Sequence, residues 1–223
     1  MLIRSDILGR TGYPATDIEL GPTRMNLHAS QAVFLLGLLL YMAIRIVFQR
    51  RVAGTPVKAT RVTLLDRTLV FLVVLGQIVV PLFYIFGTWL NFANYEAPRA
   101  LPIAGALAWL AGVWLFWRSH TDLGNNWSVT LEVRSTHQLV THGVYRGVRH
   151  PMYAAFLLLA AAQVLLLPNW TAGWSALAAV GLMCIIRVPL EESMMCEFFG
   201  EEYRQYMRST GSIVPRLWPS RVP

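Results

Sequence analysis

Long apolar stretches alternate with short polar connections along most of this chain. A helix that crosses a bilayer needs roughly 20 mostly apolar residues. On that pattern we expect five transmembrane helices, at His28–Phe48, Leu64–Trp89, Leu101–Trp117, Pro151–Leu167 and Ala172–Val188. Pro81 should kink the second helix, because proline donates no backbone hydrogen bond. The segment 168–171 is too short for anything but a tight antiparallel hairpin between the last two helices.

The pattern stays helical after Val188 but becomes charged. Glutamates alternate with methionine and aromatic residues at helical spacing as far as Tyr206, which is typical of an amphipathic helix. Gly200 should break this helix. The sequence therefore predicts an all-α integral membrane protein with about five transmembrane helices, a cytosolic loop between the third and fourth, and a C-terminal amphipathic cytosolic helix.

Composition and charge agree with a membrane protein. The chain has 223 residues, of which 55% are hydrophobic and 14% are charged, whereas soluble domains have about a quarter charged residues. The net charge is +7, and the basic residues cluster in the first connection, the third connection and the tail. With five spans these all fall on one side, which should be the cytoplasm. This pattern fits loops beside anionic lipid, so we predict no nucleic-acid partner.

The two cysteines, Cys184 and Cys196, indicate neither a disulfide framework nor a metal site. We expect a single domain over residues 1–223. Within it, residues 1–117 should form the N-terminal transmembrane helices and residues 118–215 a cofactor-binding catalytic region.

Two motifs rich in ionisable side chains border the last hairpin. The sequence RHPMY (149–153) begins the fourth helix, and RVPLEE (187–192) ends the fifth. Ionisable groups at a membrane boundary are costly, so by default they suggest a functional site. Because the two helices are antiparallel neighbours, the His150 end and the Glu191 end should meet. Taken singly, each motif also has a structural interpretation, as a loop charge, a helix cap or a solvated helix face.

The residue types at this corner suit the groups of S-adenosylmethionine. Aromatic faces suit its sulfonium, cationic or N–H donors its carboxylate, and acidic oxygens its ammonium and ribose. Methyl transfer needs alignment and exclusion of water more than acid–base chemistry, and we expect no metal. Arg187 lies one turn before Glu191, where it could hold the carboxylate or phosphate of an acceptor by a bidentate contact.

These motifs, in order, resemble a known family. From about Leu123 to Pro215, the sequences LGNNWS, HQLVTHGVYRGVRHPMY, RVPLEE and FFGEEYRQY resemble the isoprenylcysteine carboxyl methyltransferase family of integral membrane enzymes. The resemblance implies S-adenosylmethionine as donor, S-adenosylhomocysteine as product, and carboxyl O-methylation of an isoprenylcysteine-like acceptor. The compact N-terminal part looks more like the bacterial members, which implies the bacterial inner membrane with the active site facing the cytoplasm.

Carried over residue by residue, the resemblance also implies roles for individual side chains. Arg187 would contact the acceptor carboxylate and, together with Arg149, would act in catalysis. The donor pocket would be lined by His137, Gln138, Leu139, Val140, Tyr145, His150, Pro151, Met152, Tyr153, Glu191 and Glu192.

Several functions remain open at this stage. Within methyltransferases the alternatives are phospholipid or amine N-methylation and thiol S-methylation. A membrane sterol-type reductase that binds NADPH is another possibility, and a non-enzymatic lipid-binding or scaffolding protein a further one. The expected partners are membrane lipids and a lipid-like or prenylated acceptor that enters from the bilayer. The oligomeric state is left open.

Overall fold

The computed structural model of the protein describes residues 22–52, 57–60, 63–98, 100–124, 132–134 and 139–216. This part of the chain is helical apart from two short strands, so the predicted all-α fold is confirmed. The elements are α1 (Pro22–Val52), β1 (Val57–Thr60), α2 (Leu64–Val74), the π-helical turn η1 (Leu75–Val79), α3 (Val80–Phe86), η2 (Asn91–Ala93), α4 (Leu101–Leu123), β2 (Glu132–Arg134), η4 (Gly143–Arg146), α5 (Pro151–Leu166), α6 (Ser175–Phe199) and α7 (Glu201–Ser209).

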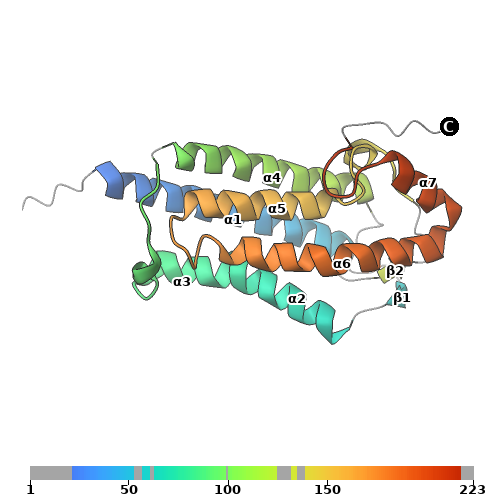
Figure 1. The fold of residues 1–223 in the computed structure, drawn as a ribbon, viewed down its shortest axis with the longest axis horizontal. Coiled ribbons are helices and arrows are strands. Elements are labelled where there is room, and N and C mark those ends of the chain that lie inside the picture. Colours follow the sequence, from blue (N-terminus) through green and yellow to red (C-terminus); the bar gives the residue numbers. More distant parts are fainter. Residues whose placement is uncertain are drawn as a thin grey trace, which may run out of the picture.

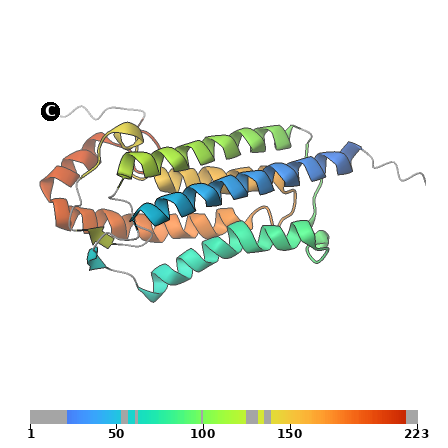
Figure 2. The ribbon, with the colours of Figure 1, turned by 180° about the vertical axis from the view of Figure 1, so that it is seen from behind.

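The long helices run side by side, with the strands and α7 at one end of the bundle (Figures 1 and 2). Strand β1 belongs to the first connection and β2 to the third, and they pair antiparallel, with Val57 opposite Arg134. The two basic connections therefore lie at the same end as α7, as their charge predicted. The pairing itself was not foreseen from the sequence.

The second and fourth connections meet at the opposite end of the bundle. The backbone N–H of Trp170 donates to the carbonyl oxygen of Ala93 at 2.8 Å, and the buried side chain of Asn169 donates to the carbonyl of Leu90 at 2.7 Å. These contacts fix the turn between α5 and α6, so the predicted hairpin is confirmed. The alternation of connections between two ends is the arrangement expected of a membrane bundle.

Three helices of the described residues are long and apolar enough to cross a membrane, at Leu27–Arg51, Leu64–Phe86 and Leu101–Leu123. The helix α5, Pro151–Leu166, is apolar but shorter. The predicted fifth span lies in α6, whose second half contains Arg187 and three glutamates, so a count of five is not confirmed. Many large apolar side chains point outward, among them Leu36, Phe83 and Ile185. The chain is an integral membrane protein.

The second apolar stretch is interrupted just before Pro81. At η1 the N–H of Val80 donates to the carbonyl of Leu75, five residues back. The carbonyl oxygen of Gly76 accepts instead from the side chains of Gln163 at 3.0 Å and Ser175 at 2.7 Å. Because Pro81 has no backbone N–H with which to continue the regular ladder, we attribute this π turn to the proline. It ties α2–α3 to α5 and α6.

Close packing in the rest of the bundle depends on small residues. Gly37 of α1 faces Trp109 of α4, whose ring nitrogen lies 1.5 Å from the position a Cβ would take. Phe34 packs beside the same indole, with ring centroids 5.0 Å apart. Any side chain at position 37 would therefore force α1 away from α4. Because α4 is also packed against α5, this contact indirectly positions the helix that begins at the candidate site.

Candidate active site

The two polar motifs meet at the end of the bundle that holds the strands and α7. The Nε2 atom of His150 lies 3.1 Å from Oε1 of Glu192, and its Nδ1 atom lies 3.6 Å from Oε2 of Glu191. The hydroxyl of Tyr153 donates to Oε1 of Glu191 at 2.5 Å. The predicted contact between the two corners is confirmed. His150 precedes α5 but makes no side-chain cap hydrogen bond, so it does not serve merely as a helix cap.

Arg149 connects this corner to the C-terminal segment. Its Nε and Nη2 atoms donate to Oε1 of Glu192 at 3.0 and 2.7 Å. Its Nη1 atom donates to the carbonyl of Met207 at 3.2 Å and to the carbonyl of Thr210. The N–H of Arg149 also donates to the carbonyl of Gly211 at 2.8 Å. A fork of fixed donors suits such a junction, and this geometry favours a positioning role for Arg149.

Arg187 is buried between two carboxylates. Its Nε atom lies 3.4 Å from Oδ1 of Asp66 in α2, and its Nη2 atom lies 3.6 Å from Oε1 of Glu191. Arg187 is one turn before Glu191 on α6, as its spacing predicted. Asp66 is not among the site residues predicted from the sequence. The guanidinium therefore lies where three elements meet: α2, α6 and, through Tyr153 and Glu191, α5.

Tyr145 is fixed from both sides on the loop before α5. Its hydroxyl donates to the carbonyl of Ser119 in α4 at 3.4 Å, and its own carbonyl accepts from the hydroxyl of Tyr206 in α7. Gly143, at the start of η4, has φ +59°, a conformation that favours glycine. A Cβ there would lie 2.1 Å from Oδ2 of Asp122. The glycine therefore lets the loop approach α4 closely.

The remaining predicted donor residues are placed as follows. Pro151 is buried in the first turn of α5, where its missing N–H is harmless. Met152 is partly buried and packs against the apolar core to which α1, α3, α4 and α5 contribute, and Leu139 and Val140 are half-buried. His137 and Gln138 lie outside the described residues, so their predicted roles stay untested.

Two pKa shifts follow from the cluster. Burial alone would lower the pKa of His150, but hydrogen bonds and charges from Glu191 and Glu192 outweigh burial and raise it above its usual 6.5. The hydrogen bond from His150, and the one from Arg149, lower the pKa of Glu192 to about 2. At neutral pH, Glu192 is therefore an anion, and His150 is more readily protonated than a free histidine.

These shifts predict how stability depends on pH. Protonated His150 should stabilise the fold fully below pH 6.5, and this contribution should vanish as the pH rises through its raised pKa. Ionised Glu192 should contribute fully above pH 4.5 and lose its effect as the pH falls towards about 2. The thermal midpoint of His150→Gln should therefore be lower than that of the wild type. The difference between the two midpoints should be largest below pH 6.5 and smaller at higher pH. A difference independent of pH would contradict the pairing.

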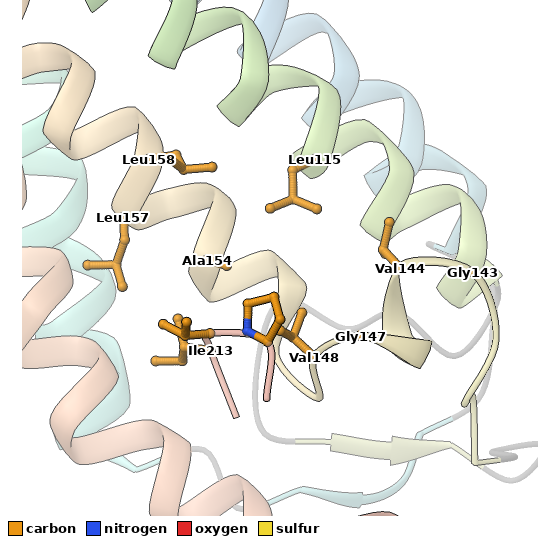
Figure 3. A pocket seen from close by; sticks show the side chains of 11 residues that line it. Leu115, Gly143, Val144, Gly147, Val148, Ala154, Leu157, Leu158 and Ile213 are labelled. Carbon is orange, nitrogen blue, oxygen red and sulfur yellow. The ribbon is translucent and has the colours of Figure 1, made fainter. Parts of the chain in front are cut away.

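An apolar groove of about 570 Å³ lies beside the cluster, between α4, α5 and the C-terminal segment (Figure 3). None of the residues predicted for the site lines it. The boundary between the ionic cluster and the groove falls between Ser212 and Ile213. The Ser212 hydroxyl donates to Glu192 at 3.3 Å, whereas Ile213 lines the groove. The lining residues are Leu115, Gly143, Val144, Gly147, Val148, Ala154, Leu157, Leu158, Ile213, Val214 and Pro215.

Sequence reasoning missed the residues that support the cluster from outside the motifs. Asp66 forms a capping box with Thr63, and the spelling T-x-x-D before an apolar run is a recognisable signal for such a cap. Nothing in the sequence indicates its ion pair with Arg187. The backbone contacts of Gly211 and Ser212 have no signature in side-chain chemistry either. Among the described residues, no group of three or more His, Cys, Asp or Glu side chains could hold a metal ion.

The cluster and the bundle around it define an integral membrane protein with a buried ionic site at one end. Residues 105–197 match the model of the isoprenylcysteine carboxyl methyltransferase (ICMT) family. Over this region the chain is similar to that family, and the family resemblance predicted from the motifs is confirmed, whereas the likeness to its bacterial members is not. The match begins earlier than the motifs did, within α4, and ends near the C-terminus of α6.

Individual relatives agree with the family match. The chain is 34% identical over 113 residues to protein-S-isoprenylcysteine O-methyltransferase A of Arabidopsis thaliana, an alignment covering 51% of this chain and 55% of the relative. It is 34% identical over 94 residues to the protein-S-isoprenylcysteine O-methyltransferase of Tribolium castaneum, covering 41% and 34% of the two chains. It is also 39% identical over 75 residues to the methanethiol S-methyltransferase of Pseudomonas deceptionensis, covering 33% and 27%. The chain thus spans about half the length or less of these relatives.

Proposed function

We propose that the protein is an S-adenosylmethionine-dependent methyltransferase that acts on a lipophilic acceptor at the membrane, by carboxyl O-methylation of an isoprenylcysteine-like compound. The observation that supports this most directly is the contact between His150 and the two glutamates of α6. It joins the two motifs that the chain shares with the family into one ionic site beside apolar helices. The relatives named isoprenylcysteine O-methyltransferases support the same reaction.

The residues present fit the donor. The carboxylate of Glu191 suits an ammonium or a ribose hydroxyl, and the ring of Tyr145 offers an aromatic face for a sulfonium. His150, protonated more readily than usual, suits the donor's carboxylate. When bound, S-adenosylmethionine supplies the methyl group. The residues of this chain bind and orient both partners and exclude water, which is what an in-line transfer requires.

Arg187 is the proposed contact of the acceptor carboxylate. Its side chain is 6% exposed, so an ion pair formed there is shielded from solvent and from salt. Arg149 is proposed to position Glu192 and the C-terminal segment, because its donors are engaged by Glu192 and two carbonyls. The other predicted pocket residues keep their proposed donor-binding role, including His137, Gln138, Leu139 and Val140.

A second candidate is methylation of a thiol. The supporting observation is that Arg187 already faces two carboxylates, Asp66 and Glu191, so its charge is largely compensated. An uncharged acceptor would not have to compete with them, and the methanethiol S-methyltransferase relative points to the same chemistry. We do not propose phospholipid or amine N-methylation or an NADPH-dependent reductase, but the experiment described next also tests for them.

Calorimetric titration of the purified protein in detergent tests the proposed function. We expect S-adenosylhomocysteine to bind and NADPH not to bind. Transfer of labelled methyl from S-adenosylmethionine to N-acetyl-S-farnesylcysteine, to an alkyl thiol and to phosphatidylethanolamine then separates the acceptor classes. Binding of NADPH without S-adenosylhomocysteine would overturn the proposal. Transfer only to the thiol would establish the second candidate instead.

The location of the protein is part of the proposal. We infer that the end with the strands and α7 faces the cytoplasm, because the basic connections gather there, and that the membrane is the bacterial inner membrane. The acceptor would enter from the bilayer and the donor from the cytoplasm. The division into an N-terminal helical part (1–117) and a catalytic region (118–215) likewise stays a prediction.

A further inference from the structure

A carboxylate from the N-terminal half of the chain faces the proposed acceptor-binding arginine. Oδ1 of Asp66 lies 3.4 Å from Nε of Arg187, and the two side chains are 4% and 6% exposed. Asp66 lies outside residues 105–197, where the family model matches, and in a part of the chain with no recognised motif. A buried ion pair is costly to form, so its place beside the site calls for an explanation.

Asp66 is held rigidly by the start of its own helix. Oδ2 accepts from the backbone N–H of Thr63 at 3.0 Å and from its hydroxyl at 2.9 Å. The N–H of Asp66 donates back to the Thr63 hydroxyl at 3.2 Å, which completes a capping box. Capping therefore occupies Oδ2 alone. Oδ1 is buried and, among the described residues, has no hydrogen bond; it faces the guanidinium.

The position of Asp66 determines which edge of Arg187 is left for a ligand. A guanidinium has two edges that can grip a carboxylate with two donors. Asp66 lies at Nε and Glu191 at Nη2, which together take the edge along the side chain. The outer edge is formed by Nη1 and Nη2. Glu191 shares Nη2 with the first edge, whereas Nη1 has no ion pair or hydrogen bond among the described contacts. That edge is available for an acceptor carboxylate.

We propose that Asp66 is a positioning residue for the acceptor site. It holds Arg187 by the edge that includes Nε, so that the outer edge contacts the acceptor. This inference rests on the proposed function. Asp66 itself does not touch the acceptor. Without Asp66, the guanidinium can rotate so that the edge with Nε points outward, or it can pair with Glu191 alone. The acceptor then binds an arginine that is not held in the binding orientation.

The variant Asp66→Asn tests this role, because asparagine keeps the shape of the side chain and an oxygen for the cap while removing the charge. With N-acetyl-S-farnesylcysteine as acceptor, we expect kcat/KM to fall roughly 10- to 100-fold, mainly through KM. The affinity for S-adenosylhomocysteine should stay within about twofold, since the described contacts of the Asp66 side chain are to Thr63 and Arg187 and include no residue proposed to bind the donor. Arg67→Gln, an exposed charge change at the next residue of α2, is the matched control and should behave as wild type.

A double-mutant cycle with Arg187→Lys shows whether Asp66 acts through Arg187. Lysine keeps the charge but lacks the fork. The double variant should be no worse than Arg187→Lys alone. Fully additive losses, or a parallel loss of S-adenosylhomocysteine affinity in Asp66→Asn, would overturn the proposal, because both indicate a structural role.

A spectroscopic readout keeps the test independent of the acceptor. The Nε–H resonance of Arg187, identified by its absence from Arg187→Lys, should shift in Asp66→Asn and stay in place in Arg67→Gln. An unchanged resonance in Asp66→Asn would overturn the inference. If the wild-type protein methylates no acceptor, the proposed function is contradicted. The Nε–H resonance then still shows whether Asp66 positions Arg187.

Discussion

Arg149→Ala should destabilise the protein by about 1.5–3 kcal/mol and abolish binding of S-adenosylhomocysteine. The Arg149 side chain is 9% exposed and pairs with Glu192 at 2.7 Å. Its removal leaves that carboxylate with His150 and Ser212 as its remaining partners, and it leaves two carbonyls, of Met207 and Thr210, without this donor. Deleting one member of such a pair costs more than the pair itself contributes, because the other charge, here on a side chain only 17% exposed, stays largely removed from water.

The loss should reach beyond the ion pair. The segment Gly211–Ser212 is joined to the start of α5 by backbone hydrogen bonds to Arg149 and His150 at 2.8 and 3.0 Å. Once the guanidinium is gone, this segment and α7 are held mainly by those bonds and by the Tyr206 contact to Tyr145. We therefore expect the donor site to open together with the loss of stability.

Thermal unfolding in detergent, followed with and without S-adenosylhomocysteine, measures both effects. Arg146→Ala is the matched control, since Arg146 is an exposed arginine of the same loop, and it should shift the midpoint little. Arg149→Lys should fall between wild type and alanine, because it restores charge without the fork. An alanine variant with wild-type stability and binding would show that Arg149 does not hold this corner together.

Glu191→Gln should weaken binding of S-adenosylhomocysteine by about tenfold to 100-fold while leaving the fold largely intact. The Glu191 carboxylate accepts from Tyr153 and lies within ion-pair distance of His150 and Arg187. In the proposed function it also takes the ammonium or ribose of the donor. A hydrogen bond that involves a charged group contributes about 1.5–3 kcal/mol, and each 1.4 kcal/mol is a factor of ten in affinity. Glutamine keeps the shape and one acceptor oxygen, so packing should survive.

Two further variants serve as comparisons for Glu191→Gln. Glu201→Gln alters an exposed glutamate of α7, paired with Arg208 at the surface, and should leave donor affinity unchanged. Glu192→Gln should lower stability more than Glu191→Gln, because Glu192 joins Arg149, His150 and Ser212. Calorimetric titration gives the donor affinities of the three variants, and thermal unfolding gives their stabilities. Equal affinity in Glu191→Gln and wild type would remove Glu191 from the donor site.

The parts of the fold that local pattern determines were predictable. The hairpin between α5 and α6 followed from two apolar runs with a short separation, and the end of α6 followed from Gly200, which has φ +60°. The meeting of His150 with Glu191 and Glu192 then followed from helix geometry alone. Each of these depends on residues close in sequence or on the single assumption that consecutive helices are antiparallel neighbours.

The parts that depend on distant residues were not predictable. Asp66 and Arg187 are brought together by the packing of α2 on α6, which no periodicity encodes. The pairing of β1 with β2 joins the first and third connections, neither of which has a strand pattern. The fifth span stayed uncertain for a physical reason, because Arg187 and Glu191 shorten the apolar part of α6. Residues that form ion pairs at the membrane boundary interrupt the continuous apolar pattern by which a transmembrane helix is recognised.

The most direct test of the whole account is photo-crosslinking of labelled S-adenosylmethionine to the purified protein, followed by mapping of the labelled peptides. The account predicts label in the peptides that contain residues 143–153 and 187–206, competed by S-adenosylhomocysteine and strongly reduced in Glu191→Gln. Competable label confined to α1, α2 or α3 would place the donor elsewhere and contradict the account.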